Sequence, residues 1–409
     1  MTTYSIGRRQ FVIAGAAGLA VAGLGPRVHA QGAKPYKIGA LNPVTGAGES
    51  YGSGMQTAIL FAADEVNANG GAAGRKLEVS AEDTQTTPDA AVLAAKKLVN
   101  VNDVDAVLGT WSSGVTLAVM PITADANVIE MNTSGAPAIS QEDQKDLVYR
   151  FQATNDRFGQ AFAEIAKKEG FKRPATMAYN NASGRGNAEG FQKAWKAMGG
   201  DTVADVVYEP KQSSYRSEIQ KILSANPDVI VTGSYLPDTT IIMREWYQMG
   251  GANAWIIPGW AANAKLIENV GAAPLESVFS VDMVPAIDSR AYAQFNQKFK
   301  EKTGKAGQDN VYATMTYDMV ITLALAIQHA GPDAGNDAIK QSIRAVANPD
   351  GKKVYSFAEG KKALEAGESI NYEGASSRLD FDEYGDVTPN FGVSTLADGA
   401  WTRQYIVEI

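Results

Sequence analysis

The sequence predicts an α/β protein made of two doubly wound, parallel-sheet lobes. Short apolar segments of strand length alternate with amphipathic segments of helix length from Lys37 onward. This alternation is typical of parallel sheets whose strands are joined by crossover helices. The strands are too many for one compact sheet, and 409 residues, 45% of them hydrophobic, suffice for more than one domain.

The first elements are marked by periodicity and by helix-end signals. An apolar strand is predicted at residues 37–44, followed by a helix with apolar residues near 3.6-residue spacing. The Asn-Gly-Gly of residues 69–71 is a typical helix stop. The next strand is predicted at 76–84, and Pro88 begins a helix over 88–100, because proline suits the first helical turn.

The later elements repeat this pattern and then change character. The further strands are predicted at residues 104–109, 127–132, 147–152, 175–180, 204–209, 228–233, 254–259 and 277–282. Helices are predicted at 157–170, 215–226, 312–331 and 336–346. Segments 376–393 and 401–409 are predicted as hairpin strands. After the N-terminal region, no segment is expected to be long and apolar enough to span a membrane.

Composition excludes several classes of chemistry. The net charge of −8 and the pI near 5.1 argue against nucleic acid as a partner, because phosphate binding requires a basic face. The chain has no cysteine, so disulfides, thiolate nucleophiles and cysteine metal sites are excluded. The histidines are His29 and His329. We predict no cofactor and no metal.

The N-terminus predicts export. Arg8 and Arg9 precede an apolar run of about 15 residues, which is shorter than the roughly 20 that a spanning helix needs. Val28-His29-Ala30 resembles a signal-peptidase site, so residues 1–30 are expected to be removed after Ala30. The arginine pair resembles a twin-arginine export signal. The protein is therefore expected in the periplasm, with His329 as its one histidine.

The stretch GTWSSGVT, residues 109–116, follows an apolar strand and could suit several functions. It nearly matches the nucleophile elbow G-x-S-x-G, but Thr110 replaces the first glycine. His329 is predicted at a helix end, which leaves these serines without a base. No Walker loop occurs, and Gly184-Arg-Gly186 is only part of a dinucleotide fingerprint.

The turn in this stretch can also bind an anion. The first N–H groups of a helix lack internal partners, and the helix dipole favours negative charge there. Ser112 or Ser113 could equally cap the helix. Capping and ligand binding are both left open by the residue types.

The chain as a whole resembles a type I periplasmic binding protein of the leucine/isoleucine/valine-binding family. The resemblance runs from about Lys37 to the C-terminus. It rests on an ordered set of motifs, namely KIGALNPVTGAGESYG, AADEVNANGGAAGRKLEV, VDAVLGTWSSGVTLAVMPI, NVIEMNTSGAP, DVIVTGSYLPDTTIIMREWYQMG and RLDFDEYGD.

The resemblance implies two lobes joined by three crossings, with a ligand enclosed between them. Lobe 1 would comprise residues 31–153 and 284–372, and lobe 2 residues 154–283 and 373–409. It implies a monomer that delivers a small carboxylate to the membrane permease subunits of an ABC transporter. Two rival functions remain, an exported α/β hydrolase with a serine nucleophile and a ligand-sensing module of a receptor.

The resemblance also assigns site residues. Ser113 would hold the ligand's carboxylate with its hydroxyl and N–H, and Ser112 would cap the helix. Ser134 and Ala136 lie where a backbone carbonyl takes the ligand's ammonium, although Ala136 lacks the family's hydroxyl. Tyr235 would close over the ligand from lobe 2. Ser183 stands where the family often has a lid tyrosine.

The sequence differs from the family's amino-acid binders at a position that contacts the ligand. Amino-acid binders of the family place a glutamate at or next to Trp260, where it pairs with the ligand's ammonium. An unpaired cation in a closed cleft is costly. Either Asp282 or Asp156 substitutes, or the ligand has no ammonium. Trp111, Tyr51, Tyr235 and Trp260 would line an aromatic cleft, which favours an aromatic or keto acid slightly over an amino acid.

Overall fold

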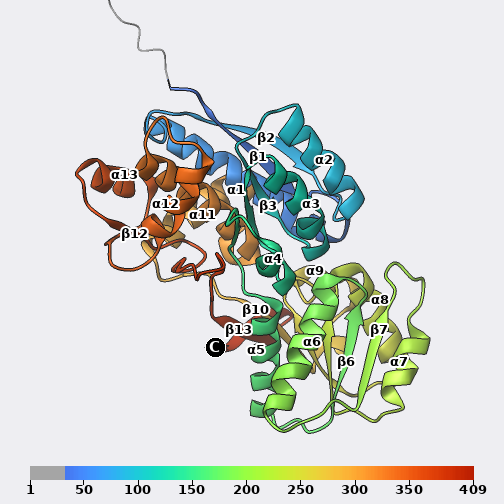
Figure 1. Ribbon diagram of the computed structural model, residues 1–409. Helices are drawn as coiled ribbons and strands as arrows, with labels where there is room; N and C mark the ends of the chain where they lie inside the picture. The colour runs from blue at the N-terminus through green and yellow to red at the C-terminus, as the bar shows by residue number, and fades with distance from the viewer. Residues whose placement is uncertain (1–32) are drawn as a thin grey trace, which may run out of the picture. The chain divides into compact units, whose positions relative to one another are not determined.

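Strands and helices alternate along the chain as the apolar pattern predicts (Figure 1). The structure is a computed structural model that describes residues 33–409. The predicted export signal and the cleavage site after Ala30 lie outside the described residues. Every strand predicted between residues 37 and 282 is present, with its ends within two residues of the prediction. The α/β class is therefore confirmed.

The first sheet has five parallel strands in the order β2-β1-β3-β4-β5. They are β1 (Tyr36–Asn42), β2 (Leu77–Asp83), β3 (Ala106–Thr110), β4 (Ile129–Asn132) and β5 (Val148–Arg150). Alternate side chains of β1 face opposite layers of helices, as strand geometry requires. Ile38 and Ala40 join the core that contains α1 and α11, whereas Leu41 joins the core under α2 and α3.

The helices that accompany the first sheet come from both ends of the described chain. From the N-terminal part come α1 (Glu49–Ala68), α2 (Pro88–Asn100), α3 (Ser113–Asp125) and α4 (Pro137–Glu142), with the short η1 (Gly46–Gly48). From the C-terminal part come α10 (Arg290–Thr303), η3 (Gly307–Asp309), α11 (Val311–Ala330), α12 (Asn336–Ala347) and α13 (Phe357–Glu365), with the small parallel pair β11 (Lys352–Val354) and β12 (Ile370–Tyr372).

The second sheet has seven strands in the order β14-β13-β10-β9-β8-β6-β7. The parallel strands are β6 (Pro174–Tyr179), β7 (Ala204–Tyr208), β8 (Val229–Gly233), β9 (Ala254–Pro258) and β10 (Val278–Met283). The antiparallel strands β13 (Phe391–Ala397) and β14 (Ala400–Val407) complete it. Its helices are α5 (Asn155–Lys168), α6 (Ala182–Ala197), α7 (Arg216–Leu223), α8 (Leu236–Gln248), α9 (Ala264–Val270) and η2 (Ala273–Leu275).

The expectation that no segment after the N-terminal region is long and apolar enough to span a membrane was wrong. Helix α11 is 20 residues long and apolar enough to cross a membrane, although no such segment was expected after the N-terminus. However, 94% of its apolar window is buried inside the protein. Its side chains pack against α1, α12 and α13, so α11 is the central helix of the first core.

The C-terminal hairpin is shorter than predicted. β13 and β14 pair as expected, but residues 376–390 form no strand. That segment is instead bonded through side chains. The carboxylate of Asp318 accepts bonds from Ser376, and the amide of Asn348 bonds to the backbone of Phe381. Polar turn residues such as Asp382 hold it in an irregular course.

Candidate functional site

Several of the predicted site residues lie where strand order reverses in each sheet. In the first sheet β1 lies between β2 and β3, and in the second β6 lies between β7 and β8. Connections leave the sheet in opposite directions at such a point, which opens a crevice at the carboxyl ends of the strands. Tyr51 and Trp111 follow β1 and β3, while Ser183 and Tyr235 follow β6 and β8.

The turn between β3 and α3 begins with a glycine that no other residue could replace without strain. Gly109 has φ +99°, and a Cβ there would lie 2.0 Å from the Asn42 Nδ2. Ser112 then occupies the N-cap position in extended conformation, and its carbonyl accepts bonds from the N–H groups of Val115 and Thr116. Among residues 33–409, the N–H groups of Ser113 and Gly114 have no acceptor.

The hydroxyl groups of this turn have different partners from those expected. Ser112 stands at the N-cap, but its side chain makes no capping bond, so its predicted capping role is wrong for the hydroxyl. Its Oγ lies 3.0 Å from the Tyr235 hydroxyl instead. The Oγ of Ser113 accepts a 3.1 Å bond from the N–H of Ala136, which ties together the turns after β3 and β4.

Ser134 belongs to the same linked pair of turns. Its Oγ donates to the carbonyl of Trp111 at 2.9 Å and lies 2.7 Å from the Thr116 Oγ1. Ser134, Thr116 and Ser113 are all buried. The two turns therefore form one hydrogen-bonded unit at the edge of the sheet.

Arg150 was not predicted, and it occupies the carbonyls that the sequence analysis assigned to a ligand's ammonium. Its Nη1 donates to the carbonyls of Ser134 and Ala136 at 2.8 and 3.1 Å. Its Nε pairs with Asp386 at 2.7 Å, and its side chain is 1% exposed. The only signal in the sequence was a charged residue within the apolar segment 147–152.

Tyr235, which follows a strand of the second sheet, contacts the turn between β3 and α3. It precedes α8, and its hydroxyl lies 3.0 Å from the Ser112 Oγ and 3.4 Å from the Asn181 Nδ2. Its ring centroid lies 5.3 Å from that of Trp111. The structure therefore brings the two predicted residues, one from each side, into contact.

Trp111, Tyr51, Tyr235 and Tyr312 form an aromatic cluster around this contact. The Trp111 ring centroid lies 6.0 Å from that of Tyr51 and 5.7 Å from that of Tyr312. Tyr51 and Tyr312 meet edge to face at 5.1 Å. Tyr312 was missed, because at the start of the apolar helix α11 it could not be told from a core residue.

Trp260 packs within the second half of the molecule rather than in the aromatic cluster. Its indole N–H donates to the carbonyl of Ser234 at 2.9 Å, and its ring meets Phe158 edge to face at 5.1 Å. Trp260 is 4% exposed. The indole N–H of Trp260 therefore already has an acceptor within the protein.

Asp282 lies at the end of β10, beside Gly259. A Cβ on Gly259 would be 2.5 Å from the Asp282 Oδ2, so the carboxyl occupies the space that a side chain at 259 would need. Its Oδ1 accepts the N–H of Met283, and in the described chain no lysine or arginine pairs with it. Burial raises the pKa of Asp282 to about 7. Asp156, the other candidate, is exposed and paired with Lys193 at 2.9 Å.

Ser183 lies in the first turn of α6. Asn181 caps that helix by accepting the N–H of Gly184 at 2.7 Å, and the carbonyl of Ser183 accepts the Asn155 Nδ2 at 3.2 Å. Gly184 and Gly186 are helical, which does not match the turn of a dinucleotide fingerprint.

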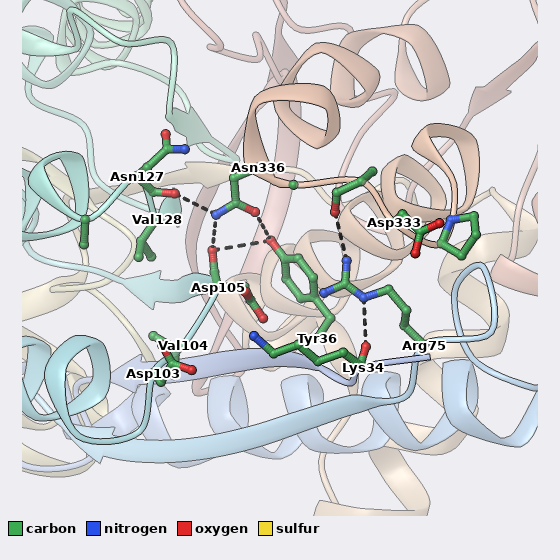
Figure 2. A pocket seen from close by; sticks show the side chains of 14 residues that line it. Lys34, Tyr36, Arg75, Asp103, Val104, Asp105, Asn127, Val128, Asp333 and Asn336 are labelled. Carbon is green, nitrogen blue, oxygen red and sulfur yellow. Dashed lines mark hydrogen bonds between the residues drawn. The ribbon is translucent and has the colours of Figure 1, made fainter. Parts of the chain in front are cut away.

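A cavity of about 480 Å³ lies at the opposite ends of the first-sheet strands (Figure 2). Tyr36, Arg75 and Asn336 of its lining bond to one another or to the backbone. Asn336 donates to the carbonyls of Asp105 and Asn127, and Arg75 donates to those of Lys34 and Ala334. These bonds fasten the start of β1 to the loop before α12. None of the predicted site residues lines this cavity.

Within residues 33–409, the histidine that could act as a base lies away from the serines of the turn. His329 lies in the last turn of α11 as predicted, with its Nδ1 2.9 Å from the Ser342 Oγ of α12. Among the residues described, no group of three or more histidine, aspartate or glutamate side chains is placed to hold a metal ion.

Comparison with known proteins agrees with this arrangement. The family model described as periplasmic binding protein matches residues 35–369. A Leu/Ile/Val-binding protein of Rhizobium johnstonii is 25% identical over 322 residues, which are 78% of this chain and 84% of that protein.

Two solved structures share the fold. A leucine-binding protein LivK from Thermotoga maritima has a TM-score of 0.78 at 22% identity, covering 91% of this chain and 98% of that one. A solute-binding protein of an ABC transporter from Rhodopseudomonas palustris, in complex with 3,4-dihydroxybenzoic acid, has a TM-score of 0.70 at 22% identity, covering 91% and 97%. The chain belongs to the periplasmic binding protein family, whose members bind solutes and are not enzymes.

Proposed function

We propose that this protein is the solute receptor of an ABC importer and that it binds a small carboxylate at the start of α3. The observation that carries the proposal is the pair of N–H groups of Ser113 and Gly114, which have no acceptor in the described chain. They lie at the switch point of the first sheet, and Tyr235 faces the same turn. Oriented N–H groups at a helix start stabilise an anion.

The rest of the ligand is proposed to be apolar, with an aromatic or keto acid favoured. The aromatic cluster offers ring faces beside the carboxylate position. The carbonyls of Ser134 and Ala136 already accept hydrogen bonds from Arg150, which supports a ligand without an ammonium group. The Rhodopseudomonas structure with its bound dihydroxybenzoic acid is a relevant precedent.

An amino acid is the second candidate, and Asp282 favours it. Its carboxyl has no cationic partner in the described chain and lies near Tyr51, whose pKa its charge helps to raise. A ligand ammonium would supply the missing charge. The name of the Rhizobium relative points the same way.

The proposed receptor has two lobes that close by hinge bending. We assign residues 31–153 and the segment from 284 to about 386 to lobe 1, and the remainder up to 409 to lobe 2. The third crossing is placed after Asp386 rather than at residue 373, because Asp386 and Ser376 bond to Arg150 and Asp318 of the first-sheet region. Ligand bound between the lobes would stabilise the closed form.

Export completes the proposal. Family members are periplasmic, and the N-terminal arginine pair with its apolar run supports cleavage after Ala30. The mature protein would act as a monomer and pass its ligand to the membrane permease subunits. Mass spectrometry of the protein from a periplasmic extract would test the cleavage site, and sedimentation would test the monomer.

The deciding experiment is a thermal-shift screen followed by calorimetric titration. The panel should pair L-leucine with 4-methyl-2-oxopentanoate and L-phenylalanine with phenylpyruvate, and include benzoate and 3,4-dihydroxybenzoate. A ligand at about 100 times its Kd stabilises the folded state by about 2.7 kcal/mol. Binding of leucine with no response to the keto or aromatic acids would reject the favoured class.

A further inference from the structure

A buried carboxyl group lies beneath the proposed binding turn. Glu130 is on β4, fully buried, with its Oε1 3.3 Å from the Thr110 Oγ1 and its Oε2 2.8 Å from the Thr123 Oγ1. No lysine or arginine of the described chain forms an ion pair with it. Burial raises the pKa of Glu130 to about 8. A carboxyl group without a cation in an apolar core is expected to hold a proton.

Charged groups on the neighbouring elements do not neutralise Glu130. Asp143, in the loop before β5, is the charge that acts on it and raises its pKa further. Asp125 at the end of α3 is exposed, and Lys145 donates to the carbonyl of Ala124. Arg150 on β5 is paired with Asp386.

Three hydroxyl groups connect Glu130 to the binding turn. The Thr110 Oγ1 lies 2.9 Å from the Thr116 Oγ1, which in turn lies 2.7 Å from the Ser134 Oγ. Ser134 is 2.9 Å from the carbonyl oxygen of Trp111. That carbonyl belongs to the peptide that leads into Ser112 and the start of α3.

The number of hydroxyl hydrogens shows that this series of hydrogen bonds requires a proton on Glu130. The series contains four close contacts, from Glu130 to Thr110, Thr116, Ser134 and the Trp111 carbonyl, but the hydroxyls supply three hydrogens. With Glu130 ionised, Thr110 donates to Oε1, Thr116 donates to Thr110 and Ser134 donates to Trp111. The 2.7 Å contact between Thr116 and Ser134 then has no hydrogen. A proton on the Oε1 of Glu130 supplies the fourth, while the hydroxyl hydrogen of Thr123 is shared between the Glu130 Oε2 and the carbonyl of Met120.

We propose that a proton on Glu130 holds the turn after β3 in its ligand-binding form, so that Glu130 is a positioning residue that couples carboxylate binding to protonation. The inference rests on the proposed function. Loss of the proton leaves the contact between Thr116 and Ser134 without a hydrogen. It also places a negative charge beneath the proposed site of the ligand's carboxylate. Both effects weaken binding, so ligand binding must in turn favour the protonated form.

The test is the pH dependence of affinity for L-leucine and for benzoate, measured by calorimetry between about pH 6.5 and 8.5. If the ligand raises the pKa of Glu130 by about one unit, Kd rises about threefold over this range. Near pH 8, titrations in two buffers of different ionisation enthalpy should show proton uptake on binding. A wild-type affinity for benzoate that is constant over the range would overturn the inference.

Glu130→Gln is the matched variant, because its amide can donate to Thr110 and accept from Thr123 without ionising. We expect its affinity for benzoate, which has no ammonium group for Asp282 to bind, to equal the wild-type value at about pH 6.5 and to stay constant. Retention of the wild-type slope in this variant overturns the proposal. Thr116→Val removes the middle hydroxyl and should give weak, pH-independent binding, whereas Asp318→Asn, at another buried carboxyl group, should keep the wild-type profile.

The two proposals fail in different ways. If neither probe binds at any pH, the ligand class of the proposed function is wrong. Infrared difference spectra of the ligand-free protein then still test Glu130. A protonated carboxyl band near neutral pH that is absent in Glu130→Gln supports the inference, and its absence from the wild type overturns it.

Discussion

The hydroxyl oxygens of Ser112 and Tyr235 lie 3.0 Å apart, although the residues are 123 positions apart and follow strands of different sheets. Ser112 precedes α3 and Tyr235 precedes α8, so the bond joins two helix starts across the proposed cleft. Because each group can donate or accept, the pair can also re-form around a ligand oxygen. This bond is therefore a direct point at which to test closure.

Tyr235→Phe should weaken ligand binding while leaving the fold intact. The variant keeps the ring contact with Trp111 but loses the bonds to Ser112 and Asn181. A net loss of about 0.5–1.5 kcal/mol is typical for one hydrogen bond, so Kd should rise about 2- to 12-fold. Tyr405→Phe, which removes a hydroxyl bonded to Glu169 at the sheet edge, is the control in the same titration. Equal affinities in the two variants would remove the Tyr235 hydroxyl from the site.

Ser113→Ala should weaken binding by about 1–3 kcal/mol if its hydroxyl contacts a buried carboxylate. The substitution also leaves the N–H of Ala136 without its 3.1 Å acceptor, so some stability is lost as well. Urea denaturation of the ligand-free protein measures that second effect separately. Ser224→Ala, at the C-cap of α7, provides the control. Unchanged affinity in Ser113→Ala would exclude the hydroxyl as a ligand contact.

Asp386→Asn should destabilise the protein strongly. It leaves the Arg150 guanidinium, 1% exposed, without its carboxylate, and an orphaned buried charge typically costs about 3–5 kcal/mol. Asp156→Asn breaks the exposed pair with Lys193 and should cost less than about 1 kcal/mol. Chemical denaturation of both variants makes the comparison. Similar losses would show that Asp386 does not compensate Arg150.

Asp282→Asn should change how stability depends on pH. Burial raises the pKa of Asp282 to about 7, above the value near 3.9 of an exposed aspartate. The folded state therefore holds a proton that the unfolded chain has lost, and this contribution to stability decreases as pH rises from about 4 to 7. The variant should lack that decrease in denaturation curves.

The same variant distinguishes the two ligand classes. If the ligand carries an ammonium group, Asp282→Asn should weaken its binding by tenfold or more, since the carboxylate is its proposed partner. An aromatic or keto acid should bind the variant about as well as the wild type. Calorimetry with L-leucine and benzoate separates these outcomes.

The sequence predicted the fold well because its signals were local. Strands such as β3 and β8 are continuous apolar runs, and α2 begins with the expected proline at Pro88. Residues 376–390 were assigned wrongly because their alternating apolar residues resemble a strand, whereas distant partners such as Arg150 and Asn348 determine their course. Such long-range bonds leave no local pattern.

The candidate site was only partly predictable. The resemblance to the binding-protein family assigned Ser113 and Tyr235 to the site, and the structure places both after the carboxyl ends of strands, β3 and β8. The roles of Arg150 and Glu130 could not be read from sequence, because each depends on which backbone or hydroxyl groups surround it. Tyr312 lies in an apolar helix, where periodicity alone cannot distinguish a cleft residue from a core residue.

The interleaving of the chain between the two sheets has a consequence for biosynthesis. The first sheet needs α11 from residues 311–330 for its core, and the second needs β13 and β14 from residues 391–407 to cover β10. Neither sheet is therefore finished from a contiguous stretch as the ribosome releases it. The core of the first sheet must wait for α11 and the second sheet for the last strands, as is usual when contacts are distant in sequence. A chain truncated before Phe391 would expose the edge of β10 and should aggregate rather than yield one working half.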